Sequence, residues 1–288
     1  MSTPLYSNNS IVIVLHKQTQ NICKILKSLD VQTHQVFIAY LVFDRASDDP
    51  LFNKDQLELE ISSLNLKFKT NIITPDAPTL TKRSSSNFFA GYCRNVGIDA
   101  AINDGADIVT MIDGDCLPQQ NLLLNHTEQC KYKIPILSCG KRREHKYGWK
   151  DRRECDSGII NYGLFRKNTI INDSELLKQC IIVWSCNIAI NIDAINRIKK
   201  FNEMYYGRSE VFCSDFNGEW GGEDSFLGIQ AWICRVIITT TPGSAIEHID
   251  HPPHYSNALD HKTFFDNMVS DIRTKTFMKP VLLDFFTA

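Results

Sequence analysis

The sequence lacks several features that mark common classes of protein. It contains no run of about 18 apolar residues, so no membrane-spanning helix is expected. The first ten residues hold no apolar stretch of signal-peptide length, and the ten cysteines include no Cys-x-x-Cys pair. The formal charge is only −2, which does not favour binding to nucleic acid. We therefore expect a cytoplasmic protein with reduced thiols, and peripheral attachment to a membrane stays open.

The chain is long enough and apolar enough to form at least one domain with its own hydrophobic core. With 288 residues, of which 43% are hydrophobic, it can bury a large core. The length fits one domain with insertions, or one domain followed by a tail. Residues from about 256 onward have the pattern of a C-terminal helical tail.

Apolar runs alternate with helical periodicity through the first 112 residues. We expect buried strands at residues 11–15, 36–43, 68–74 and 108–112, and helices at residues 19–29, 57–64 and 87–103. Such alternation indicates an α/β fold with a mixed, mostly parallel sheet flanked by helices. Ligands of such sheets bind beyond the carboxyl ends of the strands, where Asp44, Asp113 and Asp115 fall.

The second half of the sequence is less regular. Residues 141–154 are dense in lysine and arginine, which suits either a solvated surface loop or a loop that closes over a ligand. An acidic, glycine-rich turn at residues 218–223 precedes an expected helix at 224–234 and a strand near 235–240.

Asp113-Gly114-Asp115 follows a buried strand and could bind a cation. Two carboxylates on one turn can point into one cleft, and Mn²⁺ or Mg²⁺ prefers oxygen ligands. The alternative is a solvated Asp-Gly turn. Downstream, His248 is the first of three histidines within seven residues, and an imidazole can complete a manganese shell. A zinc site is the rival interpretation, but the cysteine spacing does not support it.

The segment from Trp220 to Asp224, Trp-Gly-Gly-Glu-Asp, is the sharpest local pattern. Paired glycines let a ligand approach the backbone closely, and one of the two carboxylates can act as a general base. Trp220 suits the wall of a sugar site. In the alternative interpretation, the acidic pair begins a helix and the tryptophan belongs to the core.

Together these segments resemble the metal-dependent glycosyltransferases of the GT-A fold. Asp113-Gly114-Asp115 resembles their Asp-x-Asp motif, and residues 28–49 are similar to the start of family 2 transferases. Cys93 to Ile98 resembles the Ala-Arg-Asn-x-Gly-Ile helix of that family. Residues 184–187 and 220–224 resemble the C-terminal half of β-1,4-galactosyltransferases, chondroitin-polymerase-type enzymes and polypeptide N-acetylgalactosaminyltransferases.

The resemblance implies a transferase domain over residues 1–255, with a donor-binding half at about 10–116 and an acceptor and catalytic half at about 117–255. It implies a UDP-sugar donor, a glycan or glycoconjugate acceptor, and Mn²⁺ or Mg²⁺ as cofactor. The implied metal ligands are Asp113, Asp115 and His248, with His251 in reserve. The implied catalytic residues are Asp224, as the base of an inverting reaction, and Glu223.

Other residues are implied to bind substrate. Asp44 would bind the nucleoside base, Arg94 would orient the donor, and Glu223 with Trp220 would position the acceptor. The full set of implied substrate-binding residues is Asp44, Arg94, Asp113, Trp184, Trp220, Gly221 and Gly222. Lys17 or Arg83 is a further candidate for a phosphate contact, although Leu15-His16-Lys17 departs from the family pattern.

Two other functions stay open from the sequence. A sugar-phosphate nucleotidyltransferase would share the sheet and the metal carboxylates, but its usual glycine-rich loop is absent after residue 15. A non-catalytic carbohydrate-binding or interaction protein on the same fold would need neither a metal site nor Asp224.

Overall fold

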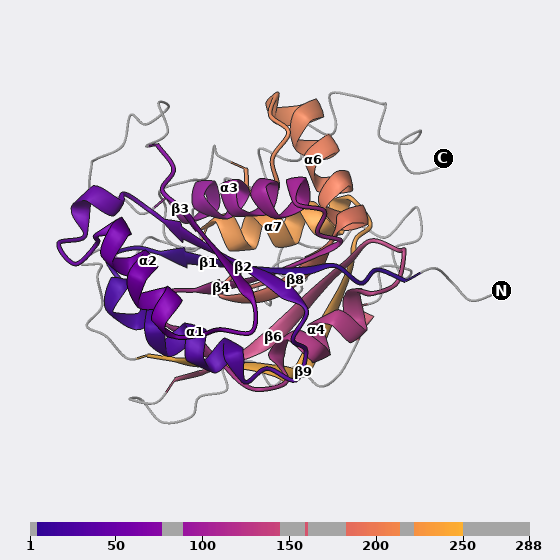
Figure 1. The fold of residues 1–288 in the computed structure, drawn as a ribbon. Helices are drawn as coiled ribbons and strands as arrows, with labels where there is room; N and C mark the ends of the chain where they lie inside the picture. The colour runs from indigo at the N-terminus through magenta and orange to yellow at the C-terminus, as the bar shows by residue number, and fades with distance from the viewer. Residues whose placement is uncertain (1–4, 77–88, 145–158, 161–182, 214–221, 250–288) are drawn as a thin grey trace, which may run out of the picture.

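The computed structural model describes residues 5–76, 89–144, 159–160, 183–213 and 222–249 (Figure 1). Several sequence predictions lie outside these ranges, namely the tail at 256–288, Arg83, Trp220, Gly221 and His251. Within the described ranges, no helix is both long enough and apolar enough to cross a lipid bilayer.

The described strands and helices have the following bounds. The strands are β1 (Asn9–Leu15), β2 (Phe37–Phe43), β3 (Lys69–Ile73), β4 (Ile108–Asp113), β5 (Cys116–Pro118), β6 (Ile136–Glu144), β7 (Ile159–Ile160), β8 (Asn187–Asn191) and β9 (Ile237–His248). The helices are η1 (Thr19–Asn21), α1 (Ile22–Asp30), η2 (Ala46–Asp48), α2 (Lys54–Ser63), α3 (Ala90–Asn103), α4 (Leu122–Cys130), α6 (Ile192–Tyr206) and α7 (Gly222–Ile233).

The nine described strands form one mixed sheet. Its order is β3-β2-β1-β4-β8-β6-β9-β5, with β7 beside β9. The first four strands in that order are mutually parallel, and β8 runs antiparallel to both β4 and β6. β6 and β9 are parallel, while β5 returns antiparallel along β9. This topology brings the end of β9 beside the turn that leaves β4.

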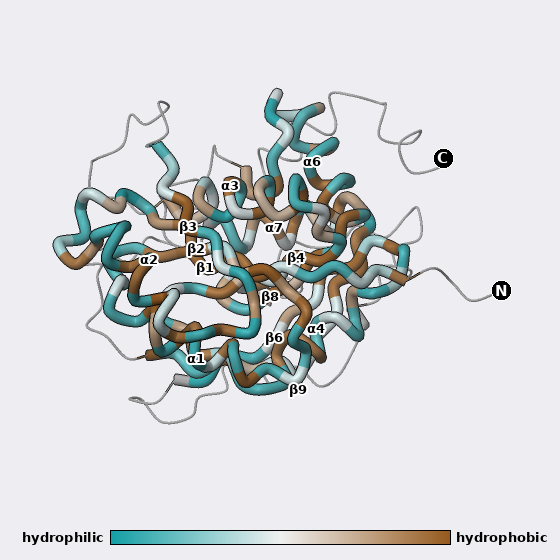
Figure 2. Tube along the Cα trace, in the orientation of Figure 1, coloured by the Kyte–Doolittle hydropathy of each residue, from teal (hydrophilic) through white to brown (hydrophobic). Residues whose placement is uncertain are grey.

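Apolar residues of the central strands are buried on both faces of the sheet. Every residue of β1 is buried, as its β-branched run predicts. One core cluster joins the sheet to α3, α6 and α7, and a second joins it to α1, α2 and α4. Figure 1 shows these two sets of helices on opposite sides of the sheet, and Figure 2 shows hydrophobic residues along the strands beneath them.

Gly97 lets α3 pack closely against the sheet. A Cβ atom at this position would lie 2.4 Å from Cγ1 of Val12 and 3.1 Å from Cγ2 of Val42. Any larger residue would push the helix away from β1 and β2. The glycine therefore fixes the position of α3, which carries Arg94 one turn earlier.

The structure corrects the sequence interpretation of the second half. Lys141 to Glu144 form the end of β6 and pair with β9, so the expectation of a loop is wrong for these four residues. Residues 145–154 of that basic stretch lie outside the described ranges. Four consecutive charged residues show no apolar alternation, so the sequence carries no local sign of a strand here. The sequence also gave no indication of α4 and α6 as helices, nor of β8 as an antiparallel strand between two parallel sets.

Candidate functional site

The candidate site lies at the carboxyl end of β4. Asp113 is the last residue of this strand, and Asp115 follows immediately before β5. β5 pairs with β9 in a register that places Cys116 opposite His248. The amide of Ile249 donates a hydrogen bond of 2.6 Å to the carbonyl oxygen of Asp115. Sheet pairing therefore holds the aspartate turn against a strand more than 120 residues downstream in the chain.

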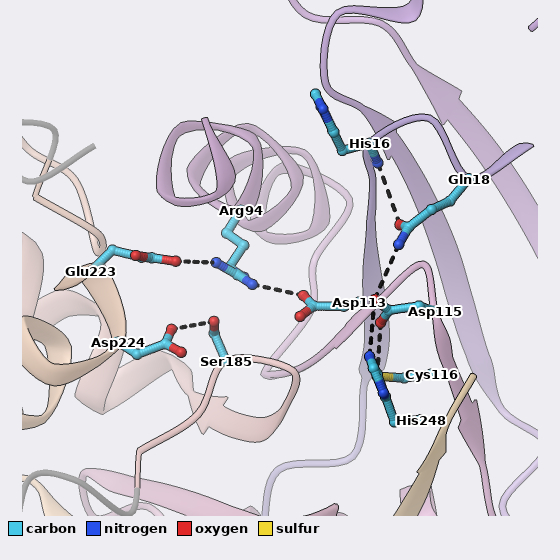
Figure 3. Close-up of polar contacts among 10 residues, drawn as sticks. All are labelled: His16, Gln18, Arg94, Asp113, Asp115, Cys116, Ser185, Glu223, Asp224 and His248. Atoms are coloured by element: carbon cyan, nitrogen blue, oxygen red, sulfur yellow. Dashed lines mark hydrogen bonds and ion pairs between the residues drawn. The ribbon is translucent and has the colours of Figure 1, made fainter. Parts of the chain in front are cut away.

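Three polar groups of the described residues contact the carboxylate of Asp115 (Figure 3). Its Oδ2 lies 3.3 Å from Nε2 of His248 and accepts a hydrogen bond of 3.1 Å from Nε2 of Gln18. The thiol of Cys116 donates to Oδ1 at 3.2 Å. The sequence predicted that Asp115 and His248 lie together, but it gave no indication of Gln18.

Gly114 is required because Gln18 and Leu15 occupy the space next to it. A Cβ atom there would lie 2.6 Å from Oε1 of Gln18 and 2.8 Å from Cδ2 of Leu15. A glycine between the two aspartates thus allows Gln18 to reach Asp115.

Arg94 joins the aspartate turn to the start of α7. It donates to Oδ1 of Asp113 at 2.7 Å and to Oε1 of Glu223 at 3.2 Å (Figure 3). Arg94 is only 2% exposed, and burial alone would lower the pKa of the guanidinium. The charges of Asp113, Asp224 and Glu223 outweigh burial and raise that pKa, so Arg94 is a permanent cation.

The neighbours of Arg94 explain the Arg-Asn pair of the α3 motif. Oδ1 of Asn95 accepts the amides of Val211 and Phe212 at 3.1 and 2.8 Å, and its Nδ2 donates to the carbonyl of Phe212 at 2.7 Å. The ring of Phe212 then lies 5.5 Å from the guanidinium carbon of Arg94, within cation–π range. Asn95 therefore fixes the loop against which Arg94 packs.

Asp224 lies beside Arg94 but has a different partner. The hydroxyl of the fully buried Ser185 donates a hydrogen bond to Oδ1 of Asp224 (Figure 3). Glu223 is buried against Arg94, whereas Asp224 retains intermediate exposure. Trp184, the preceding residue in the same motif, is partly buried and packs against the core cluster of α1 and α2. Of the two adjacent carboxylates, Asp224 is the one that a solvent-borne group can reach.

The concentration of acidic groups alters their proton affinities. Burial, and next the charge of Asp224, raise the pKa of Glu223 to about 8, although Arg94 opposes this shift. Burial also raises the pKa of Asp113, with Arg94 opposing and Asp115 and Asp224 adding to the shift. Excess negative charge in a buried place favours a bound cation.

Asp44 lies at the carboxyl end of β2, next to the end of β1. It is 4% exposed, and its Oδ2 lies 2.8 Å from Nδ1 of His16 and accepts the amide of Phe89 at 3.3 Å. The backbone amide of His16 in turn approaches Oε1 of Gln18 at 3.5 Å. A short series of polar contacts thus connects Asp44 to the turn at Asp115.

The donor atoms around Asp115 fit a divalent metal in part. A carboxylate and an imidazole that face each other at 3.3 Å supply oxygen and nitrogen, which suit Mn²⁺. Asp113 instead has Oδ1 directed at Arg94. Within the described ranges, no three His, Cys, Asp or Glu side chains are arranged as a metal-binding group. Of the described residues, Asp115 and His248 therefore offer one oxygen and one nitrogen ligand, and a bound metal would need further ligands to complete its shell.

The remaining predicted residues are placed in different ways. Gly222 is the first residue of α7, directly before the acidic pair. Lys17 is exposed in the loop after β1, with a left-handed backbone at φ 54°. Trp220, Gly221 and Arg83 belong to the ranges that the structure does not describe.

No protein-family model matches the chain, and no curated protein matches it significantly in sequence. Solved structures do resemble it. The structure of S. aureus TarS residues 1–349 in complex with UDP matches with a TM-score of 0.54 at 15% identity, over 96% of this chain and 73% of that one. TarS 1–349 in complex with UDP-GlcNAc gives 0.54 at 15% identity, over 93% and 67%. GalNAc-T7 with UDP, GalNAc and Mn²⁺ gives 0.54 at 14% identity, over 92% and 48%.

At such low identity, these likenesses concern the fold alone. They confirm the fold class predicted from the sequence, which is the mixed, mostly parallel α/β sheet of the GT-A type flanked by helices.

Proposed function

We propose that the chain is a metal-dependent, inverting glycosyltransferase that moves a sugar from a UDP-sugar to an acceptor hydroxyl. The acceptor would be a glycan or a lipid-linked or protein-linked glycoconjugate. The observation that carries the proposal is the convergence of two distant acidic segments, at residues 113–115 and 223–224, on the two sides of Arg94. The UDP, UDP-GlcNAc and Mn²⁺ in structures of the same fold support the choice of donor and metal.

On the donor side, Asp115 and His248 would hold Mn²⁺ or Mg²⁺, with Asp113 as the third predicted ligand. A bound metal would supply positive charge that stabilises the departing diphosphate. Gln18 orients the carboxylate of Asp115 through its hydrogen bond. Asp44, at the far end of the same series of contacts, would bind the nucleoside base. Arg94 keeps Asp113 oriented and balances its charge.

On the acceptor side, Asp224 would take the proton from the attacking hydroxyl. Ser185 holds one oxygen of this carboxylate, and the other would accept the proton. Glu223 contacts Arg94 and so fixes the start of α7, in addition to its predicted role in positioning the acceptor. General base catalysis of this kind contributes about 10²–10⁴-fold to the rate.

The proposed reaction is a single displacement with inversion. The acceptor oxygen attacks the anomeric carbon from the face opposite the diphosphate. The bond between that carbon and the phosphate oxygen breaks, and its electron pair leaves with UDP. The acceptor proton passes to Asp224 in the same step.

The test is UDP release from a panel of UDP-sugars in the presence of Mn²⁺. We expect release by the wild type with at least one donor, and a loss of about 10²–10⁴-fold in Asp224→Asn with donor binding intact. The matched control is Asp99→Asn, which removes a surface carboxylate of α3 that pairs with Lys199; this variant should behave as wild type.

Two other outcomes would indicate a different function. Pyrophosphate-dependent formation or breakdown of a sugar nucleotide would indicate a nucleotidyltransferase. Sugar binding without turnover, unchanged in Asp224→Asn, would indicate a non-catalytic carbohydrate-binding protein.

A further inference from the structure

Arg142 lies beside the candidate site, although no recognised motif includes it. The sequence places it at the start of the basic stretch. In the structure it belongs to β6, where it pairs with Ile246 of β9. Two residues further along β9 is His248, one of the predicted metal ligands. Arg142 is therefore held by sheet hydrogen bonding near the site, rather than in a loop.

The partner of Arg142 across the sheet shows which face its side chain occupies. Ile246 is fully buried in the same core cluster as Cys116 and Cys186. Paired residues of neighbouring strands project to the same face, and so do residues two apart on one strand. The side chains of Arg142, Ile246 and His248 thus project to the same face of the sheet. Cys116, which pairs with His248 and directly follows Asp115, projects to this face as well.

The surroundings of Arg142 agree with this placement. Its Nε atom is buried. Burial would lower the pKa of the guanidinium, but interactions with Cys186 and Cys116, and with Asp115 and Asp113, together raise it. The cation is thus within electrostatic reach of both aspartates of the Asp-Gly-Asp turn. Arg94 interacts with Asp113, Glu223 and Asp224, so the two arginines share Asp113, and Asp115 is among the groups that raise the pKa of Arg142.

We propose that Arg142 binds a phosphate oxygen of the nucleotide diphosphate, on the side of the site formed by Asp115 and His248. This inference rests on the proposed function. A guanidinium presents a planar fork of donors that matches phosphate oxygens, and it keeps its charge when partly buried. As the glycosidic bond of the donor breaks, its electron pair moves to the diphosphate, and Arg142 stabilises that added negative charge.

Arg143 provides a matched control. It is the next residue of β6, pairs with Glu247, and projects to the opposite face from Arg142. Replacing either arginine by methionine removes one positive charge from the same strand with similar loss of side-chain volume. A difference between the two variants therefore reports the position of the charge rather than the net charge.

The test is calorimetric binding of UDP, UMP and uridine, each with and without Mn²⁺. For Arg142→Met we expect roughly 10- to 100-fold weaker binding of UDP, the loss typical of a charge-assisted hydrogen bond. Binding of uridine should be unchanged, which also shows that the variant is folded. Arg143→Met should bind all three ligands as the wild type does. Arg142→Lys, which keeps the charge but not the fork, should lose several-fold in UDP affinity.

The outcomes separate this inference from the function on which it rests. If the wild type binds UDP more tightly than uridine and Arg142→Met keeps that difference, the role of Arg142 is refuted and the proposed function stands. If the wild type does not bind UDP, both are refuted. If Arg142→Met does not fold, Arg142→Lys decides, because unchanged UDP affinity in that variant also refutes the role.

Discussion

Replacing Arg94 by methionine should destabilise the protein strongly, by an amount that grows with pH. The variant removes a cation that is 2% exposed and leaves Asp113 and Glu223 without their common partner. Removing one partner of a buried ion pair costs about 3–5 kcal/mol. Asp113 keeps 25% of its side chain exposed, and Glu223, with a pKa of about 8, is mostly protonated at pH 7. We therefore expect the lower end, about 3 kcal/mol at pH 7.

The pH dependence follows from proton binding. Without Arg94, the pKa values of Asp113 and Glu223 should rise further in the folded state, because the opposing charge is gone. The folded variant then holds more protons than the folded wild type, so its stability falls faster as pH rises. The difference between the two proteins should be smallest near pH 5 and largest near pH 9.

The assay is thermal unfolding in EDTA across this pH range, so that no metal contributes. A loss of about 3 kcal/mol corresponds to a decrease in Tm of about 6–12 °C for a domain of this size. Arg94→Lys keeps the charge and should lose less. Lys199→Met removes one partner of a surface ion pair with Asp99 and should cost less than about 1 kcal/mol. Equal Tm values for wild type and Arg94→Met, or a difference that shrinks as pH rises, would refute this reasoning.

Three further predictions concern single residues of the site and its support. The pKa of Glu223 in the folded protein lies near 8, above its ordinary value of 4.5, so the stability of the wild type should fall as pH rises between these two values. Glu223→Gln removes this titration and should flatten the dependence of Tm on pH between pH 5 and 8. An unchanged dependence in the variant would contradict the raised pKa. Gln18→Leu should weaken Mn²⁺ binding in the presence of UDP about 10- to 100-fold in a calorimetric titration, with the exposed Gln120→Leu as control. Gly97→Ala should lower the free energy of unfolding by about 1–3 kcal/mol in denaturant titrations, because the new Cβ atom meets Val12. Adding Val12→Ala to this variant should restore part of the loss. A gain in stability from Gly97→Ala alone, as alanine gives in an open helix, would show that α3 is not tightly packed there.

The first half of the fold is readable from the sequence because each element there has a simple local cause. The β-branched run at Ile11–Leu15 predicts a strand buried on both faces, and the structure buries all of it. The predicted helix at residues 87–103 corresponds to α3, which the structure describes from Ala90 to Asn103.

The second half could not be read in the same way, because its strands depend on distant partners. Lys141–Glu144 are charged and have no apolar alternation, yet they pair with β9, about 100 residues later. Only tertiary pairing makes this segment a strand, and no local pattern reports such pairing.

The site was predictable only where its residues belong to a local motif. Motif spacing indicated Asp115, His248 and Asp224, which the structure places on neighbouring elements (Figure 3). The supporting contacts from Gln18 and Ser185 were not indicated, because a single hydrogen bond to a carboxylate has no sequence signature.

The proposed function depends on a cation that binds at Asp115 and His248 and holds the UDP diphosphate opposite Asp224. The most direct test is anomalous diffraction from crystals grown with Mn²⁺ and UDP. We expect one strong manganese peak within about 2.5 Å of a carboxylate oxygen of Asp115 and Nε2 of His248, in contact with the diphosphate. A manganese peak and UDP bound elsewhere, with His248 still directed only at Asp115, would contradict it.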